Sequence, residues 1–176
     1  GFVAMSLTRT SQLQPVTVEL DPPLTGAQEK GAIQLEMKLY YSSLDAKRFV
    51  IETRNARLEV DSLTTRASRT VNEWFSGPES KESFSPFPSG LSGLDVQKPL
   101  VFARKDTVFV SVPKVWRSIQ LGSNGELLLY CGLANSLLDL KDVKSVQFLE
   151  AGKRVETIGG HLSTLQPFTL KECRGG

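Results

Sequence analysis

His161 is the one histidine of the chain, and it follows the pair Gly159-Gly160. A histidine can serve as general base for a neighbouring nucleophile, for which Cys131 or a serine would be the partner, or it can bind a metal ion. Nothing in the sequence places such partners beside it, and one histidine does not make a His-based metal cluster. We therefore predict no catalytic residues and no metal site. We expect His161 to orient the turn after Gly160.

The carboxylates and glycines do not form a recognisable site either. Glu52 and Glu59 lie in one extended run at an odd spacing, so their side chains point to opposite faces of an unbroken strand, and we expect them to be solvated. The segment Gly122–Gly125 precedes a helix, whose N-terminus can attract anions, but it lacks the spacing of a phosphate-binding loop. We interpret it as an ordinary helix start and predict no cofactor.

Aromatic residues are the remaining candidates for function. Phe84 and Phe87 lie in the long Pro- and Gly-containing stretch 79–98, and Trp116 follows a later extended run. Large aromatic side chains dominate binding energy when they are exposed in a cluster. We predict a contact surface of Phe84, Phe87 and Trp116. The alternative for the two phenylalanines is that they clamp the loop onto the body.

The two cysteines leave two arrangements open. Cys131 falls on an apolar helical face, and Cys173 lies close to the C-terminus. We expect a buried free thiol and a thiol in the tail, because small buried cysteines are common. A disulfide between them requires the tail to fold back over that helix. Two cysteines alone do not identify a compartment.

The composition is that of an ordinary globular protein. Of 176 residues, 40% are hydrophobic and 23% charged, and the net charge is +2. The basic residues are dispersed, so there is no electrostatic argument for a nucleic-acid or anionic-membrane partner. No apolar run approaches the length of about 18 residues that crosses a bilayer. This composition favours a single domain with a tail.

We expect residues 1–34 to be an N-terminal linker, because they are rich in Ser, Thr, Gln and Pro. A short edge strand over the alternating segment Val16–Leu20 is the alternative. The apolar opening Gly1–Met5 either follows a removed signal or anchor or is an arbitrary start. One domain is expected over residues 35–170, followed by a C-terminal tail over 171–176.

Periodicity predicts the elements of this domain. Strand-like runs cover 35–41 and 48–60, joined by the turn 42–45, and cover 100–104 and 107–112 as a second hairpin. A helix capped by Asp61 or Ser62 runs to about Phe75 and ends at Gly77-Pro78. A short helical turn is expected around Trp116.

The stretch Glu126–Phe168 adds a second helix and further strands. Ser123 and Glu126 fit a capping box at the helix start. A single apolar stripe follows, made of Leu127, Tyr130, Cys131, Ala134, Leu137 and Leu138. The alternating run 143–149 predicts a strand with Val146 and Phe148 on its one buried face and Ser145 and Gln147 on the other. A second short extended run contains Val155 and Ile158.

Together these elements predict an α+β fold. We expect a two-layer sandwich in which two helices pack on one face of a mainly antiparallel or mixed sheet. Its predicted core places one side of the second helix against the central strands, through Leu127, Cys131, Ala134, Leu138, Val108, Val110, Val146 and Phe148.

The order of elements resembles the GerM domain, named for bacterial sporulation and spore germination proteins. The resemblance spans roughly Met37–Phe168. It rests on Ser136-Leu137-Leu138, Val146–Leu149, Gly152, Gly160-His161 through Pro167-Phe168, Trp74–Pro78 and Thr107–Val112. An acidic position of the family strand is Ser111 here. The order from Leu63 to Leu149 is also similar to the ring-building motif of bacterial secretion, flagellar and sporulation ring proteins.

The resemblance implies an exported, non-enzymatic protein-interaction domain of a bacterial envelope protein, membrane-anchored or periplasmic, with a role in sporulation or germination. Its implied partners are other envelope proteins, or further copies when anchored, reached through the sheet edge and helix flanks. We expect the isolated chain to be a monomer or weak dimer, because no self-complementary patch is obvious. The alternative is a cell-wall or small-ligand module with a groove lined by Phe84, Phe87 and Trp116.

Overall fold

The computed structural model describes residues 32–88 and 98–174, and these fall into two compact units. The smaller unit contains the described part of Gly1–Gln34 and Arg57–Asp61, where Arg57 pairs with Glu59 at 3.0 Å. The larger unit contains Leu35–Ala56 and the chain from Ser62 onward. The linker expected over residues 1–34 lies almost entirely outside the described residues.

The first sheet has the strand order β2-β1-β3. β1 (Ile33–Ser43) begins with the alternation of a half-buried strand, in which Leu35, Met37 and Leu39 are buried. β2 (Phe49–Leu58) follows a turn fixed by the Ser43 hydroxyl, which donates to Asp45 at 2.6 Å. The short β3 (Ser83–Phe84) pairs antiparallel with the end of β1. The first predicted hairpin is confirmed.

The second sheet has the order β4-β5-β6 and is mixed. β4 (Leu100–Arg104) runs antiparallel to β5 (Thr107–Val112), and β6 (Ser145–Glu150) runs parallel to β5. The register aligns Val108 with Val146 and Val110 with Phe148, and all four are fully buried. The one-turn helix η3 (Lys114–Ser118) follows β5 at the predicted place and buries Trp116.

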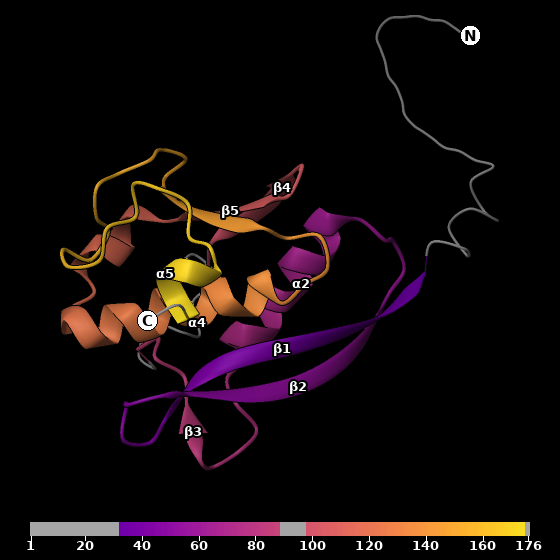
Figure 1. Cartoon of the computed structure of the whole chain (residues 1–176), viewed down its shortest axis with the longest axis horizontal. Helices are drawn as coiled ribbons and strands as arrows, with labels where there is room; N and C mark the ends of the chain where they lie inside the picture. The colour runs from indigo at the N-terminus through magenta and orange to yellow at the C-terminus, as the bar shows by residue number, and fades with distance from the viewer. Residues whose placement is uncertain (1–31, 89–97, 175–176) are drawn as a thin grey trace, which may run out of the picture. The chain divides into compact units, whose positions relative to one another are not determined.

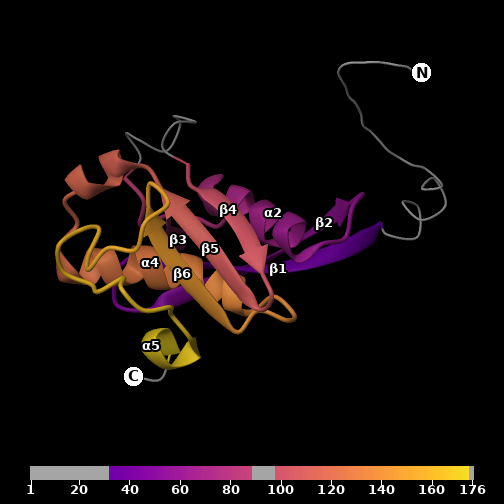
Figure 2. The same cartoon turned by 90° about the horizontal axis from the view of Figure 1, so that it is seen from above.

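Two helices lie between the sheets. α2 (Leu63–Phe75) begins at Ser62, whose hydroxyl accepts the Thr65 N–H at 3.1 Å, and it ends before Gly77, which has a φ of 86°. α4 (Gly122–Leu138) packs against α2 and β6, and the β1–β2 hairpin lies on the other side of the helices (Figures 1 and 2). The predicted α+β fold with helices on a mixed sheet is confirmed, and the first hairpin forms an additional layer.

α4 is buried on all sides, so the prediction of a single apolar stripe is wrong. Every residue from Leu128 to Leu138 is buried, whereas Leu127, which we expected in the core, is 40% exposed. The reason is the additional sheet, which covers the side that we expected to face solvent. The approach is close: a Cβ on Gly132 would lie 2.9 Å from the carbonyl oxygen of Tyr40.

β6 is likewise buried on both faces, so the solvent-facing side expected for it is also wrong. Gln147 is fully buried and its side-chain amide donates to the Thr164 carbonyl at 3.0 Å, because the chain after β6 folds back over the outer face of the strand. Ile158 is buried in this covering segment. Together with Val155 it lies outside any strand, contrary to the expected extended run.

Cys131 and Cys173 form a disulfide, so the expectation of two free thiols is wrong and the alternative pairing is confirmed. The covering segment brings α5 (Leu170–Arg174) back against α4 (Figure 1). Part of the expected C-terminal tail is therefore covalently joined to the most buried helix.

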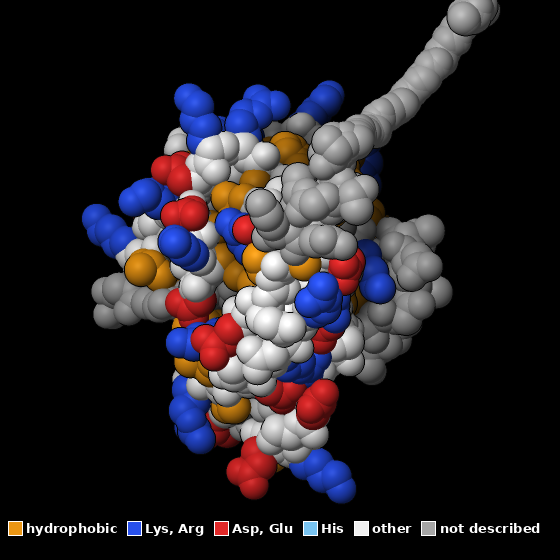
Figure 3. All heavy atoms as spheres, turned by 90° about the vertical axis from the view of Figure 1, so that its right-hand side faces the viewer, with side chains coloured by type: hydrophobic (Ala, Val, Ile, Leu, Met, Phe, Trp, Pro, Cys, Tyr) orange, Lys and Arg blue, Asp and Glu red, His pale blue; other side chains and the backbone are white. Residues whose placement is uncertain are grey.

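The surface in Figure 3 carries Lys, Arg, Asp and Glu side chains interspersed with small hydrophobic patches. No large area of one charge dominates this face. None of the helices in the described ranges is long and apolar enough to span a membrane.

Truncation of Phe148 tests the layered core. Its ring lies 5.1 Å from that of Tyr130 and 5.2 Å from that of Phe168, and it is fully buried. We expect Phe148→Ala to lower the free energy of unfolding by about 3–5 kcal/mol, measured by urea denaturation. Leu127→Ala is the control and should cost less than about 1 kcal/mol. Equal losses of unfolding free energy at the two positions would contradict the assignment of Phe148 to the core and of Leu127 to the surface.

Candidate functional site

The structure brings two of the three predicted contact residues together. Phe87 and Trp116 are buried with their ring centroids 5.0 Å apart, and both rings also contact Phe75. Phe84 is 39% exposed at the surface beside this cluster. Phe87 therefore holds the loop on the body, which was the alternative that we considered for the two phenylalanines. Phe84 is the one whose side chain is available for contact.

A pocket of about 650 Å³ opens beside the aromatic cluster. Its lining joins the end of α2, the segment around β3 and the residues before α4: Phe75, Ser76, Gly77, Phe84, Ser85, Pro86, Phe87, Pro88, Gln120 and Leu121. None of these side chains is charged. The pocket can therefore receive an apolar or neutral polar group, but its own lining supplies no acid, base or strong nucleophile.

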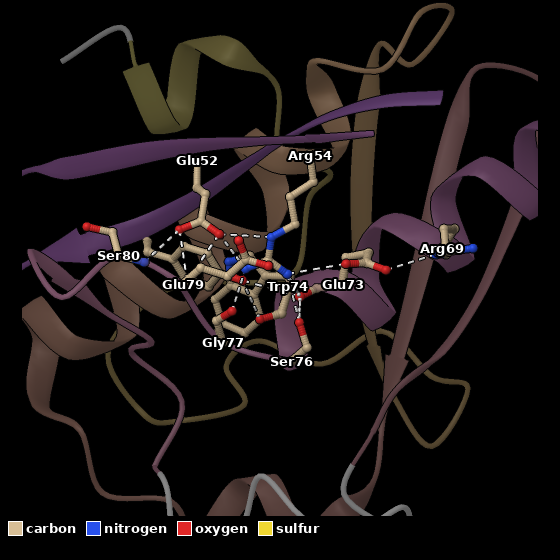
Figure 4. Close-up of polar contacts among 10 residues, drawn as sticks. Glu52, Arg54, Arg69, Glu73, Trp74, Ser76, Gly77, Glu79 and Ser80 are labelled. Atoms are coloured by element: carbon tan, nitrogen blue, oxygen red, sulfur yellow. Dashed lines mark hydrogen bonds and ion pairs between the residues drawn. The ribbon is translucent and has the colours of Figure 1, made fainter. Parts of the chain in front are cut away.

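Arg54 of β2 holds one wall of this pocket in place (Figure 4). Its guanidinium donates to the hydroxyl of Ser76 at 2.8 Å, to the carbonyl of Gly77 and to the carbonyl of Glu73 at 3.2 Å. The last turn of a helix carries unpaired carbonyls and partial negative charge, which a cation satisfies. Arg54 thus fixes the end of α2 at the point where the pocket begins.

Glu52 completes the anchor. Its carboxylate binds Arg54 and accepts the backbone N–H of Glu79 at 3.0 Å and of Ser80 at 3.3 Å. Burial raises the pKa of Glu52, but these hydrogen bonds outweigh burial, so that the pKa lies below its usual value. The expected solvated role is wrong for Glu52, whose side chain is only 16% exposed.

The neighbouring groups satisfy the rest of this network. Glu73 pairs with Arg54 at 3.2 Å and with Arg69 at 3.0 Å, and the hydroxyl of Tyr41 donates to the Trp74 carbonyl at 2.9 Å. Burial raises the pKa of Tyr41. A tyrosine that stays protonated and donates to backbone is a structural group. We therefore assign the network a positioning role for the pocket wall.

The sequence contains one signal for this network that we did not use, the spacing of Glu52 and Arg54. Glu52 and Arg54 are two residues apart on one strand, and such residues share a face of the sheet. Their spacing therefore predicts a pair. The partners on α2 and on the segment after it are 19 or more residues further along the chain, and nothing in the sequence marks them as partners.

Glu126 and His161 form a second polar site, at the start of α4. The Glu126 carboxylate is 1% exposed and accepts the N–H groups of His161 at 3.0 Å and Leu162 at 2.9 Å. Its other oxygen lies 2.6 Å from Nδ1 of the His161 ring. Glu126 is therefore not part of a capping box as predicted: α4 begins after Leu121 without a side-chain cap.

The Gly-Gly-His sequence is explained by this carboxylate. A Cβ on Gly159 would lie 2.6 Å from the carboxyl carbon of Glu126, and Gly160 has a φ of 102°. Only glycines allow the turn to close around the acid. The expected role of His161 in orienting this turn agrees with the contact.

No metal-binding group is associated with either site. Within the ranges 32–88 and 98–174, no three His, Cys, Asp or Glu side chains are grouped to hold a metal ion. A small hollow of about 290 Å³ beside His161 is lined by Ser123, Asn124, Leu127 and Leu162. The closest ionic partner of the histidine is the buried glutamate that holds its loop.

One family model matches this chain, and two solved structures share its fold. The family described as "Germane: Sporulation and spore germination" matches residues 38–156. The first GerMN domain of the sporulation protein GerM from Bacillus subtilis superposes with a TM-score of 0.57, covering 78% of this chain and 98% of that one at 11% identity. A candidate lipoprotein from Clostridium perfringens superposes at 0.55, covering 81% and 91% at 18% identity. A comparison with curated sequences gave no match.

The Glu126 site makes stability depend on pH. Burial raises the pKa of Glu126, but hydrogen bonds from Leu162 and His161 outweigh it and lower the pKa below 4.5. The ionised folded form is thus favoured above the unfolded pKa, and this stability is lost as the pH falls through the folded pKa. We expect the free energy of unfolding to fall as the pH drops below about 5.

Glu126→Gln should lower the free energy of unfolding at pH 7 by about 1–3 kcal/mol. It should also have a shallower acid slope than the parent in urea denaturation. Glu82→Gln, at an exposed position, is the control and should keep the parental slope. An unchanged slope in Glu126→Gln would show that another group controls acid stability.

Proposed function

Since the chain belongs to the Germane family of sporulation and spore germination proteins, we propose that it acts outside the cytoplasm as a non-enzymatic protein-interaction domain of a bacterial envelope protein. Its role would be in sporulation or germination, and it would be held at the membrane or cell surface in the full-length protein. Its partners would be other envelope proteins.

The disulfide is the observation that carries the extracytoplasmic assignment. Disulfides persist in oxidising compartments and are rare in the cytosol. Cys131 lies inside α4 at 1% exposure and Cys173 lies on α5, so that the bond closes the end of the fold over its core. The description of one structural neighbour as a candidate lipoprotein supports the same location.

The layout of the polar groups supports an interaction role. Glu52, Arg54 and Glu126 each bind backbone groups of a connecting segment, and the pocket beside Phe84 has a neutral lining. These groups fix the shape of the surface. A domain of fixed shape with apolar and neutral recesses is suited to contact with another protein.

We further propose that the isolated domain is a monomer or weak dimer at micromolar concentration, and that assembly depends on an anchor or a second protein. The exposed large hydrophobic residues of the described chain are distributed over several elements. A membrane anchor raises local concentration without adding contacts, which is how weak interfaces become effective.

The thiol state in cells tests the location. In the natural full-length protein, alkylation of acid-quenched cells should label Cys131 and Cys173 only after reduction. The matched control is the same domain produced in the cytoplasm without a leader, where both should be labelled directly. Free thiols in the natural protein, or its recovery in the cytosolic fraction, would contradict the proposed location.

A second candidate function is a cell-wall or small-ligand module, and the pocket favours it. The exposed ring of Phe84 and the side chains of Ser85 and Gln120 offer an apolar surface next to neutral polar groups. Such a lining matches an uncharged ring that carries hydroxyl or amide groups. The groove that we expected from the sequence included Trp116, but that side chain is buried behind Phe87 and does not line the pocket.

Thermal unfolding distinguishes the two candidates. A ligand that binds only the folded state raises the midpoint temperature of unfolding. At a ligand concentration of a hundred times its Kd, it adds about 2.7 kcal/mol to the free energy of unfolding. If the domain is a cell-wall module, muropeptide fragments should raise the midpoint of the parent and not that of Phe84→Ala. The interaction-domain proposal predicts no shift in either protein at saturating fragment concentrations.

A further inference from the structure

The outer face of β4 and β5 forms an apolar platform. The rings of Phe102 and Phe109, paired across the two strands, stack with centroids 5.0 Å apart and an angle of 9°. Leu100 beside them is 69% exposed. Figure 2 shows no described helix over these strands, whereas the chain after β6 covers the third strand.

β4 is an edge strand of the same sheet, and side chains of α2 already bind its outward-pointing backbone groups. The Ala103 N–H of β4 donates to the hydroxyl of Thr64 at 2.9 Å, and the Val101 carbonyl accepts from Ser68 at 3.4 Å. Residues 101 and 103 are those whose backbone groups point away from β5. α2 therefore supplies the hydrogen bonds that an added strand would need. At the β4 side of this sheet, a partner would therefore contact the face of β4 and β5 rather than add a strand to the edge.

Both ends of the platform are mainly basic. Arg104 and Lys105 are exposed in the turn between β4 and β5, and Lys144 follows at the same end, where its N–H binds the carbonyl of Asp106 at 2.8 Å. The exposed acids there are Asp106 and Asp142.

At the other end, Lys114 follows β5 and Lys153 lies in the turn whose Gly152 N–H binds the Ser111 hydroxyl at 2.9 Å. Glu150 beside this turn is already paired with Arg117 at 2.8 Å. Lys and Arg outnumber Asp and Glu over the whole stretch 98–174.

We propose that the face formed by Leu100, Phe102 and Phe109 is the partner-binding surface of this domain, and that the partner is an acidic protein segment whose apolar side chains pack on the two rings. This inference rests on the proposed interaction function and specifies its surface. Apolar residues of the segment cover the platform, and its carboxylates meet the cations at the two ends.

The shape of the surface favours a protein over a lipid bilayer. Phe102 and Phe109 are half-buried and lie within the sheet face, so they expose less side chain for insertion into the acyl region than protruding residues would. A second copy of the chain is disfavoured because the ends of its own platform have the same charge. The platform would meet like charge in a symmetric dimer.

Site-specific photocrosslinking in the natural full-length protein tests the surface. Leu100→p-benzoylphenylalanine is compared with the same substitution at Leu44, which is 66% exposed on the other hairpin. We expect the Leu100 probe to join a segment of another protein that is rich in Asp and Glu, identified by mass spectrometry. Its yield should be about ten times that of the Leu44 probe.

A synthetic peptide of the crosslinked segment then tests the chemistry. Arg104→Glu combined with Lys105→Glu should weaken its binding by about ten-fold, and added salt should weaken it in the parent. The matched reversal, Lys38→Glu with Lys47→Glu on the β1–β2 hairpin, should leave the Kd within about two-fold. Equal effects of the two reversals would overturn the assignment.

Crosslinking of Leu100 to phospholipid, to a second copy of the chain or to a basic segment would also overturn it, as would a yield no higher than at Leu44. A third probe at Phe84 separates this failure from failure of the proposed function. If the Phe84 or Leu44 probe captures a protein partner and the Leu100 probe does not, the domain binds partners through another surface. If no probe captures a protein, the interaction function fails as well.

Discussion

Helix α4 is the element on which the larger unit depends. It has no polar face between Leu128 and Leu138, so water must be excluded from every side. α2 and β6 pack against it, and the hairpin of β1 and β2 covers another side. Tyr40 shows how close this second contact is, since its N–H donates to the Ser136 hydroxyl at 2.9 Å and its carbonyl accepts from the Trp74 ring at 2.8 Å. A hairpin that moved away would expose α4 and break these bonds.

Local patterns in the sequence were enough to predict most elements, because each pattern reflects contacts that the element makes along its own length. The hairpins, the cap at Ser62 and the helix end at Gly77 were predicted in this way. The burial of α4 and β6 on both sides was not, since it depends on which distant segment covers the second face. Gln147 illustrates the difference: its alternation predicts an exposed position, and only the return of Thr164 explains its burial.

The candidate site was predicted less well than the fold, for the same reason. Phe84, Phe87 and Trp116 could be identified as aromatic residues of interest, but their exposure is set by how the segment 76–88 is held. Arg54 and Glu52 hold it through hydrogen bonds to backbone groups, which no residue type in the segment reveals. At the Glu126 site, the Gly-Gly-His turn can be recognised in the sequence. The distant carboxylate that makes glycine necessary there cannot.

These anchors also limit how the domain can act. Irregular segments tied to the frame by charged groups cannot rearrange cheaply, because freeing Arg54 or Glu126 would leave a largely buried charge without its partners. At the edges of the β4-β5-β6 sheet, side chains of α2 bind β4, and backbone bonds of 2.9 Å and 2.7 Å join Val146 of β6 to Phe168. Strand addition there would first have to displace existing bonds. The partner contact that we propose on this side of the domain is therefore contact with a preformed face, in which covering the exposed apolar side chains would provide affinity and the charges around them selectivity.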